Sequence, residues 1–203
     1  VLTASAAAGV RRVVVVTSAM VYGAADDNPV PLPDDAPLRA TPDGGLISDL
    51  LEIEDLCGRS ERSHPAMAVT VVRPAMVVGP GVDTVLTRHF EAPRLVLLRG
   101  SKPHWQFCHL DDLASALEEV VSGDVDGPVT VACEGWMAQE EVEALSGLGR
   151  MELPGNLALG TAERLHRLGL TPASASELHY LAKPWVVSFE RLRSLGWRPA
   201  FDN

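Results

Sequence analysis

The stretch RRVVVVTSAMVYG, residues 11–23, decides the fold expected for this chain. Its four consecutive valines lead into small polar residues, a pattern typical of a parallel strand that is buried on both faces. We expect this strand to run from Val13 to Thr17. Two further apolar runs, AVTVVRPAMVVGPG (68–81) and PVTVACEG (128–135), predict two more strands of the same kind.

Helical patterns separate these strands. Residues 46–62 carry apolar side chains at helical intervals with acids between them. HLDDLASALEEVV (109–121) has two aspartates in its first turn, as the helix dipole favours, and QEEVEALSGL (139–148) predicts another helix. Alternating strands and helices with right-handed crossovers indicate an α/β fold, a Rossmann-type doubly wound parallel sheet. Such sheets bind ligands at the carboxyl ends of their strands, here 17–22 and 73–81.

Composition narrows the class of partner. The 203 residues are 46% hydrophobic and carry a net charge of -10. This charge disfavours nucleic-acid and anionic-membrane partners, because phosphate groups are bound by clustered lysine and arginine, and it favours a small-molecule substrate. Three cysteines without a CxxC pair, and no apolar run of about 18 to 20 residues, predict a cytoplasmic protein. The chain opens inside a helical pattern, so we expect an N-terminal part ahead of it.

Four motifs, in the same order, resemble those of the extended short-chain dehydrogenase/reductases, also called the NAD-dependent epimerase/dehydratase family. They are a helix and a valine strand ending in a Ser/Thr motif and VYG (6–23), an RPxxVYGPG-like strand end (69–81), an HVDDLA-like helix start (105–117) and an LGWxP signature (188–199). The resemblance implies NAD or NADP as cofactor. The family's glycine-rich dinucleotide fingerprint lies ahead of these motifs.

The resemblance also implies a domain division and a set of site residues. Residues 1–135 are expected to form a Rossmann-type NAD(P)-binding domain, incomplete at its N-terminus, and 136–203 a small substrate lobe to which 82–105 contribute. Ser18 matches the family's Ser or Thr that hydrogen-bonds the reacting oxygen, although a serine here also suits capping of the strand end. The residues implied in cofactor binding are Thr17, Arg73, Pro74, Ala75, Met76 and Val77, and those implied in substrate binding are Met20, Tyr22, His89 and Trp105.

The family's second catalytic element, a Tyr and a Lys four residues apart on the next helix, is absent. In the family the ammonium lowers the pKa of the phenol, so that the tyrosine transfers protons. Aligning the family's Glu with Glu54 places Leu46 and Leu50 at these positions. Asp49 and, less well placed, Glu52 are the acids nearby that could replace them, but both are expected to face solvent or a subunit. The sequence thus predicts an atypical NAD(P)-dependent oxidoreductase or epimerase/dehydratase-like protein acting on a small carbonyl or alcohol compound. The alternative is a non-catalytic dinucleotide-binding or protein-interaction member of the same fold.

Three further expectations concern ligands and assembly. The segment KPHWQFCHLDD (102–112) contains potential metal ligands, but His109 and Asp112 match structural residues of the family, so no metal site is expected. Trp105 stands where many nucleotide-sugar members carry an arginine, which favours an apolar or aromatic ligand, unless the indole covers the edge of the core. The family tends to form homodimers through the helix of residues 46–62, and the apolar stripe of this helix agrees.

Overall fold

The computed structural model describes residues 1–155, 160–161, 164 and 177–203. Its centre is a parallel sheet in the order β1 (Arg12–Val16), β2 (Ala68–Pro74) and β7 (Gly127–Val131). In this sheet Val13 pairs with Val69, and Val72 pairs with Val129. The predicted parallel sheet is confirmed, with β1 beginning and ending one residue before the expected span.

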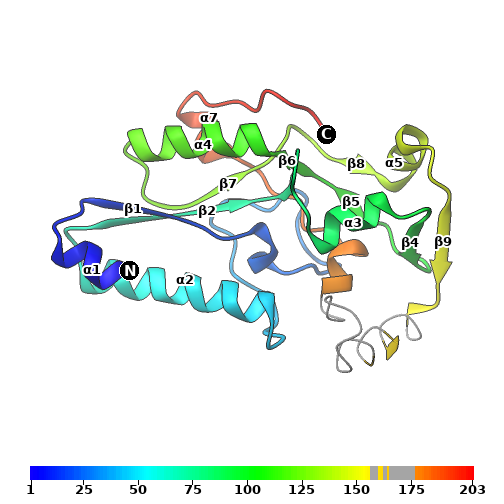
Figure 1. Ribbon diagram of the computed structural model, residues 1–203, viewed down its shortest axis with the longest axis horizontal. Coiled ribbons are helices and arrows are strands. Elements are labelled where there is room, and N and C mark those ends of the chain that lie inside the picture. Colours follow the sequence, from blue (N-terminus) through cyan, green and yellow to red (C-terminus); the bar gives the residue numbers. More distant parts are fainter. Residues whose placement is uncertain (156–159, 162–163, 165–176) are drawn as a thin grey trace.

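Helices cover both faces of the sheet (Figure 1). α1 (Leu2–Ala7) and α2 (Leu46–Ser63) lie on one side, and α4 (Leu110–Ser122) and α7 (Glu190–Ser194) lie on the other. The buried side chains of α2 recur every three or four residues, so that one stripe packs on the sheet. Asp49 and Glu52 are exposed, which confirms their expected orientation toward solvent.

The run from 68 to 81 forms two strands where the sequence predicted one. β2 ends at Pro74, and β3 (Met76–Val78) pairs with β6 (Phe107–His109). Between them, the backbone N–H of Ala75 donates to the carbonyl oxygen of Val131 at 2.8 Å. Pro74 has no N–H to continue a ladder, which explains why the strand ends there. The change of partner brings Ala75 to Val77 to the carboxyl end of the sheet.

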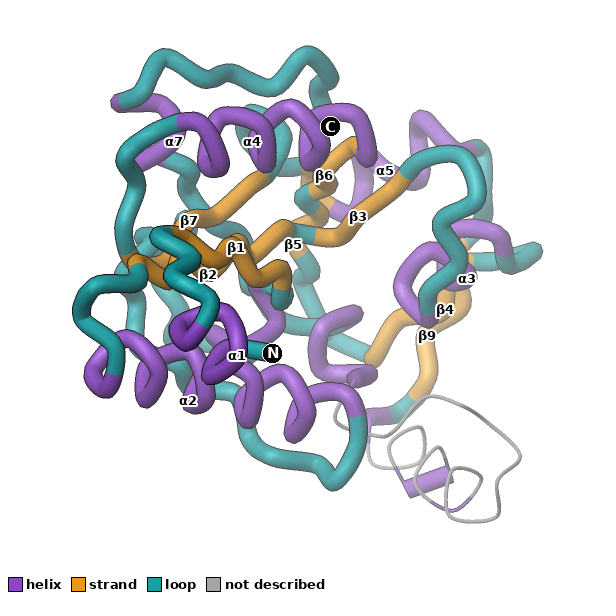
Figure 2. The backbone as a smooth tube through the Cα atoms, turned by 60° about the vertical axis from the view of Figure 1, so that its left-hand side comes forward, coloured by secondary structure: helices purple, strands orange, loops and turns teal. Residues whose placement is uncertain are grey.

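Two further two-stranded sheets lie outside the central sheet, and Figure 2 shows the first of them, β4 with β9, apart from it at one side of the molecule. β4 (Leu95–Leu98) pairs with β9 (Arg150–Leu153), and β5 (His104–Trp105) pairs with β8 (Met137–Ala138). α3 (Val85–Glu91) precedes β4, and α5 (Gln139–Ser146) follows β8. These pairings join the two segments assigned to the substrate lobe. The exact domain boundary stays a prediction, and most of residues 156–176 of that lobe lies outside the described residues.

The turn after β1 is a 3-10 helix, η1 (Ala19–Tyr22), whose four side chains are all buried. Gly23 follows it with φ 78°, and a Cβ atom at this position would lie 2.9 Å from the backbone nitrogen of Ala40. Only glycine accepts both the left-handed backbone and this close approach, which explains the glycine of the VYG motif. Within the described part of the chain, no helix is long and apolar enough to cross a membrane.

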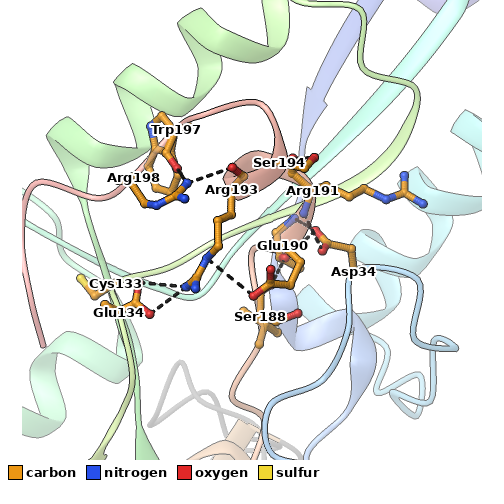
Figure 3. Close-up of polar contacts among 12 residues, drawn as sticks. Asp34, Cys133, Glu134, Ser188, Glu190, Arg191, Arg193, Ser194, Trp197 and Arg198 are labelled. Carbon is orange, nitrogen blue, oxygen red and sulfur yellow. Dashed lines mark hydrogen bonds and ion pairs between the residues drawn. The ribbon is translucent and has the colours of Figure 1, made fainter.

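Hydrogen bonds and an ion pair connect the C-terminal end of the chain to α4 and to the segment that follows β7. Asp112 accepts hydrogen bonds from the N–H groups of Ala200 (2.7 Å) and Phe201 (3.2 Å), and His109 caps α4 by accepting from the N–H of Asp111 at 3.2 Å. The structural roles expected for His109 and Asp112 are confirmed. Figure 3 shows further contacts of this segment, including the ion pair of Arg193 with Glu134 at 2.7 Å and the N–H of Arg191 donating to Asp34 at 3.4 Å.

Candidate functional site

A cavity of about 490 Å³ lies at the carboxyl ends of β1 and β2. Thr17 and Ser18 line it from the end of β1, and Pro74 to Val77 line it from the end of β2 and the start of β3. α3, η2 (Glu177–Leu181) and Trp185 contribute its other walls. The position agrees with the general rule for open α/β sheets, and the volume lies within the about 300–1,000 Å³ of small-molecule sites.

Ser18 caps the turn after β1 and also lines the cavity. Its Oγ atom caps η1 by accepting a hydrogen bond from the N–H of Met20 at 3.1 Å. The side chain is half-buried and also lines the cavity. The hydroxyl proton has no acceptor within the described part of the chain. Capping therefore fixes the oxygen and leaves the proton available to a ligand.

Leu46 and Leu50 line the same cavity as Ser18. They belong to the first two turns of α2; Leu50 is 8% exposed and Leu46 is 49% exposed. Asp49 is exposed and does not line the cavity. The first turns of α2 thus present hydrocarbon to the site. Neither leucine offers a group that could transfer a proton or hydrogen-bond a sugar hydroxyl.

A buried polar cluster lies directly behind Thr17. Glu54 and Arg73 form a two-point ion pair, with N–O distances of 2.8 Å and 2.8 Å, and both side chains are less than a tenth exposed. The Thr17 hydroxyl donates to Glu54 at 2.8 Å, and Arg73 donates to the Tyr22 hydroxyl at 3.0 Å. Tyr22 in turn donates to the carbonyl of Asp34 at 2.7 Å. Burial raises the pKa of Tyr22 against the opposing effect of Arg73, so the phenol stays protonated.

The structure brings only some of the predicted residues together. Thr17, Ser18, Met20 and Pro74 to Val77 line the cavity, whereas Tyr22, Arg73, His89 and Trp105 are not among its lining residues. Tyr22 is 0% exposed, and its hydroxyl is used within the cluster behind Thr17. Cofactor binding through the Arg73 side chain, and substrate binding by Tyr22, His89 and Trp105, stay predictions.

Trp105 is part of an aromatic cluster between α3 and β5. The indole is 1% exposed, and its Nε1 donates to the side chain of Gln139 at 2.7 Å. It stacks on His89 with ring centroids 5.3 Å apart and meets Phe90 edge-on at 4.9 Å. This is the geometry of an indole that covers the edge of the core.

The buried His89 makes the stability of the folded protein depend on pH. Burial lowers the pKa of His89 from 6.5 to about 4, because the charged imidazolium loses its hydration. The unfolded chain therefore binds more protons than the folded chain between these values, so stability falls as the pH drops through this window. We expect the free energy of unfolding, measured with urea, to fall less between pH 7 and pH 5 in His89→Phe than in the wild type. Equal losses in both proteins would contradict the buried neutral state of His89.

The geometry can be compared with known proteins. A family model described as "NAD dependent epimerase/dehydratase family" matches residues 1–130. The chain belongs to this family. An uncharacterized protein of Mycobacterium tuberculosis (strain ATCC 25618 / H37Rv) is 29% identical over 208 residues, which cover 97% of this chain and 54% of that protein. An uncharacterized protein of Mycobacterium bovis matches to the same extent. The chain spans about half the length of these curated relatives.

Solved structures of epimerases and dehydratases share the fold. The dTDP-glucose 4,6-dehydratase of Bacillus anthracis, solved in complex with NAD, has a TM-score of 0.68 and 15% identity over 99% of this chain and 60% of its own. The UDP-glucose 4-epimerase of Thermotoga maritima, solved with UDP-glucose, has a TM-score of 0.69 and 14% identity over 99% of this chain and 62% of its own. At this identity the likeness shows the Rossmann-like architecture.

The cavity fits one part of what the epimerase/dehydratase family implies. A nicotinamide dinucleotide supplies hydride chemistry, while the protein must supply the proton transfer. Ala75, Met76 and Val77 form a small apolar wall against which an aromatic ring can lie. Leu46 and Leu50 provide no hydrogen bond to a ribose and no proton. The residues therefore fit the binding of a ring and do not fit the family's acid–base chemistry.

Sequence reasoning missed several residues of the site. Trp185 lines the cavity, and no motif marks it. Asp34 accepts hydrogen bonds from the N–H and the hydroxyl of Thr130 at 2.8 Å and 2.7 Å, so it ties the loop after η1 to β7. The available signal was alternation, because Leu32, Asp34 and Ala36 are buried while the residues between them are exposed. Five prolines in this loop hid the pattern.

Proposed function

We propose that this chain is the ligand-binding part of a non-catalytic member of the epimerase/dehydratase family, which binds NAD or NADP and a small molecule. One observation carries the proposal: Leu46 and Leu50 line the cavity beside Ser18. These are the positions expected for the Tyr and the Lys, and a hydrocarbon side chain cannot act as an acid or a base. The family match and the apolar wall support dinucleotide binding.

A catalytic alternative is favoured by Ser18. Its hydroxyl proton has no acceptor in the parts of the chain that the structure describes, so it is available to polarise a carbonyl oxygen in the cavity. Under this alternative, the protein would be an atypical oxidoreductase or epimerase/dehydratase-like enzyme for a small carbonyl or alcohol compound.

Calorimetric titration of the full-length protein with NAD⁺, NADH, NADP⁺ and NADPH tests the proposal. We expect binding of at least one dinucleotide and no turnover of reduced cofactor above background on a panel of aldehydes and ketones. Turnover that falls in Ser18→Ala would overturn the proposal in favour of the enzyme. If none of the four dinucleotides binds, the proposal and its alternative both fail.

We also propose a homodimer through α2. Ile53 and Leu56 are 36% and 43% exposed and lie one turn apart on the outer face of this helix. Asp49 lies toward its start and Arg59 toward its end, so a second copy in antiparallel orientation brings opposite charges together. Light scattering should show a dimer for the wild type and a monomer for Ile53→Asp/Leu56→Asp. Leu145→Asp, at a 76% exposed position of α5, is the control and should stay dimeric.

A cytoplasmic location is proposed on the state of the cysteines. Cys57, Cys108 and Cys133 are all buried and free, as is typical of proteins in a reducing compartment. Cell fractionation of the tagged full-length protein tests this, and recovery of the protein mainly outside the cytoplasmic fraction would contradict it.

A further inference from the structure

We propose that the cavity selects an uncharged, mainly apolar ligand with one hydrogen-bond acceptor, which accepts a hydrogen bond from the hydroxyl of Ser18. The inference rests on the proposed function and adds the chemical class of the small molecule. Three observations support it: the hydrocarbon lining, the internal pairing of the other polar side chains at the site, and the balance of charge around the cavity.

The lining is mainly hydrocarbon and comes from several elements. Leu46 and Leu50 of α2 and Leu86 of α3 contribute aliphatic side chains, Met20 of η1 contributes a thioether, and Trp185 contributes a ring. Met20, Leu50, Leu86 and Trp185 are each less than a tenth exposed, so they form a fixed apolar surface. Contact with this surface removes the hydrocarbon part of a ligand from water, which favours ligands with a large hydrocarbon part.

The polar lining residues other than Ser18 are engaged within the protein. The Thr17 hydroxyl donates to Glu54 at 2.8 Å, and the Thr84 hydroxyl donates to the hydroxyl of Thr87 at 3.3 Å. Asp83 and Arg88 form a two-point ion pair at 2.6 Å and 2.7 Å, and Glu177 has a partner as well. Since a ligand gains little from groups that already have partners, Ser18 is the position where the site offers an unused donor.

The charge balance disfavours an anionic ligand. Arg88 is the single cation among the described lining residues, and its charge is balanced by Asp83. Glu177, 8% exposed, adds a second carboxylate to the lining. A carboxylate or phosphate in this cavity would lose hydration without gaining an unpaired cation. A ketone, ester or amide loses less hydration than an anion does, and its carbonyl oxygen accepts a hydrogen bond from the Ser18 hydroxyl.

Three probes of matched shape test the ligand class. 4-Phenyl-2-butanone carries an acceptor, 3-phenylpropanoate carries a negative charge, and isopentylbenzene carries neither. Each is titrated calorimetrically into the full-length protein, with and without saturating NAD⁺. We expect the ketone to bind most tightly and the carboxylate at least about tenfold more weakly. Ser18→Ala should weaken ketone binding about fivefold to tenfold and leave the hydrocarbon unchanged.

A charge added at the rim gives an independent readout. Leu46→Arg places a cation at a half-exposed lining position, so it should tighten binding of 3-phenylpropanoate about threefold to tenfold. Leu145→Arg is the control, because Leu145 is 76% exposed on α5, lies outside the proposed dimer contact and does not line the cavity. It should leave all three affinities unchanged.

Two outcomes would overturn the ligand class. One is carboxylate binding as tight as ketone binding, and the other is failure of all three probes to bind, with or without NAD⁺. Either result leaves the dinucleotide titrations and turnover assays of the proposed function untouched, so the two failures are distinguishable.

Discussion

Glu54→Ala should lower the free energy of unfolding by about 3–5 kcal/mol, because it leaves the buried Arg73 guanidinium without its counter-charge. The two side chains are only 5% and 8% exposed, so water cannot replace the lost carboxylate. Thr17 loses its acceptor in the same step. Urea unfolding at pH 7 measures the change. The loss is a large part of the about 5–15 kcal/mol that stabilises a typical domain.

A neighbouring ion pair provides the control for this prediction. Asp55 pairs with Arg59 at 3.1 Å, but the two side chains are 58% and 56% exposed. Asp55→Ala should therefore cost at most about 0.5 kcal/mol. The double variant Glu54→Leu/Arg73→Met should recover part of the loss, since it removes the unpaired charge. A loss below about 1 kcal/mol in Glu54→Ala would contradict the buried ion pair.

Trp105→Ala should cost about 3–5 kcal/mol of stability, the range for deleting a large buried aromatic side chain. The substitution removes the stacking on His89 and leaves Gln139 without the indole N–H. Trp105→Phe should retain most of the stability, because it keeps much of the ring volume. Thermal and urea unfolding of the full-length protein measure both variants.

Trp136 is the matched control for Trp105. It is 41% exposed, so Trp136→Ala should change stability by at most about 0.5 kcal/mol. Affinity for 4-phenyl-2-butanone separates the two roles considered for Trp105. A core role predicts that Trp105→Phe leaves this affinity unchanged. A marked loss of affinity at full stability would instead show that the indole contacts the ligand.

The fold was predictable where local pattern and tertiary packing agree. The run of valines at 13–16 placed β1, and the apolar stripe of α2 placed that helix with one buried face. The expected burial of β1 on both faces is wrong, because β1 is an edge strand of the described sheet and its valines are only partly buried, with Val16 44% exposed. Two strand boundaries were harder to predict from the sequence. The end of β2 at Pro74 depends on β7, whose Val131 accepts from Ala75, and β3 exists because Met76 finds a partner in β6. Such long-range pairing leaves little trace in local composition.

The sequence predicted that Ser18, Leu46 and Leu50 lie at the site, but it did not predict the residues that form the other walls of the cavity. Ser18 follows the valine strand β1, and alignment of the family's Glu with Glu54 placed Leu46 and Leu50 at the start of the next helix, where the structure shows them lining the same cavity as Ser18. Arg73 looked equally suited to a ligand, but its charge is held by Glu54, 19 residues earlier in the chain. The sequence shows a charged residue at a strand end, while its direction depends on a partner supplied by another element.

Tyr180 links the far wall of the cavity to the turn that carries Ser18. Its hydroxyl donates to the carbonyl of Met20 at 2.6 Å, and its own carbonyl accepts from the indole of Trp185 at 2.9 Å. Local unfolding of residues 177–185 must therefore break the hydrogen bond between Tyr180 and η1. A ligand that contacts both η1 and residues 177–185 stabilises the closed arrangement, and more so as more of the protein has ligand bound. Amide hydrogen exchange should therefore slow in both segments, although they are distant in sequence.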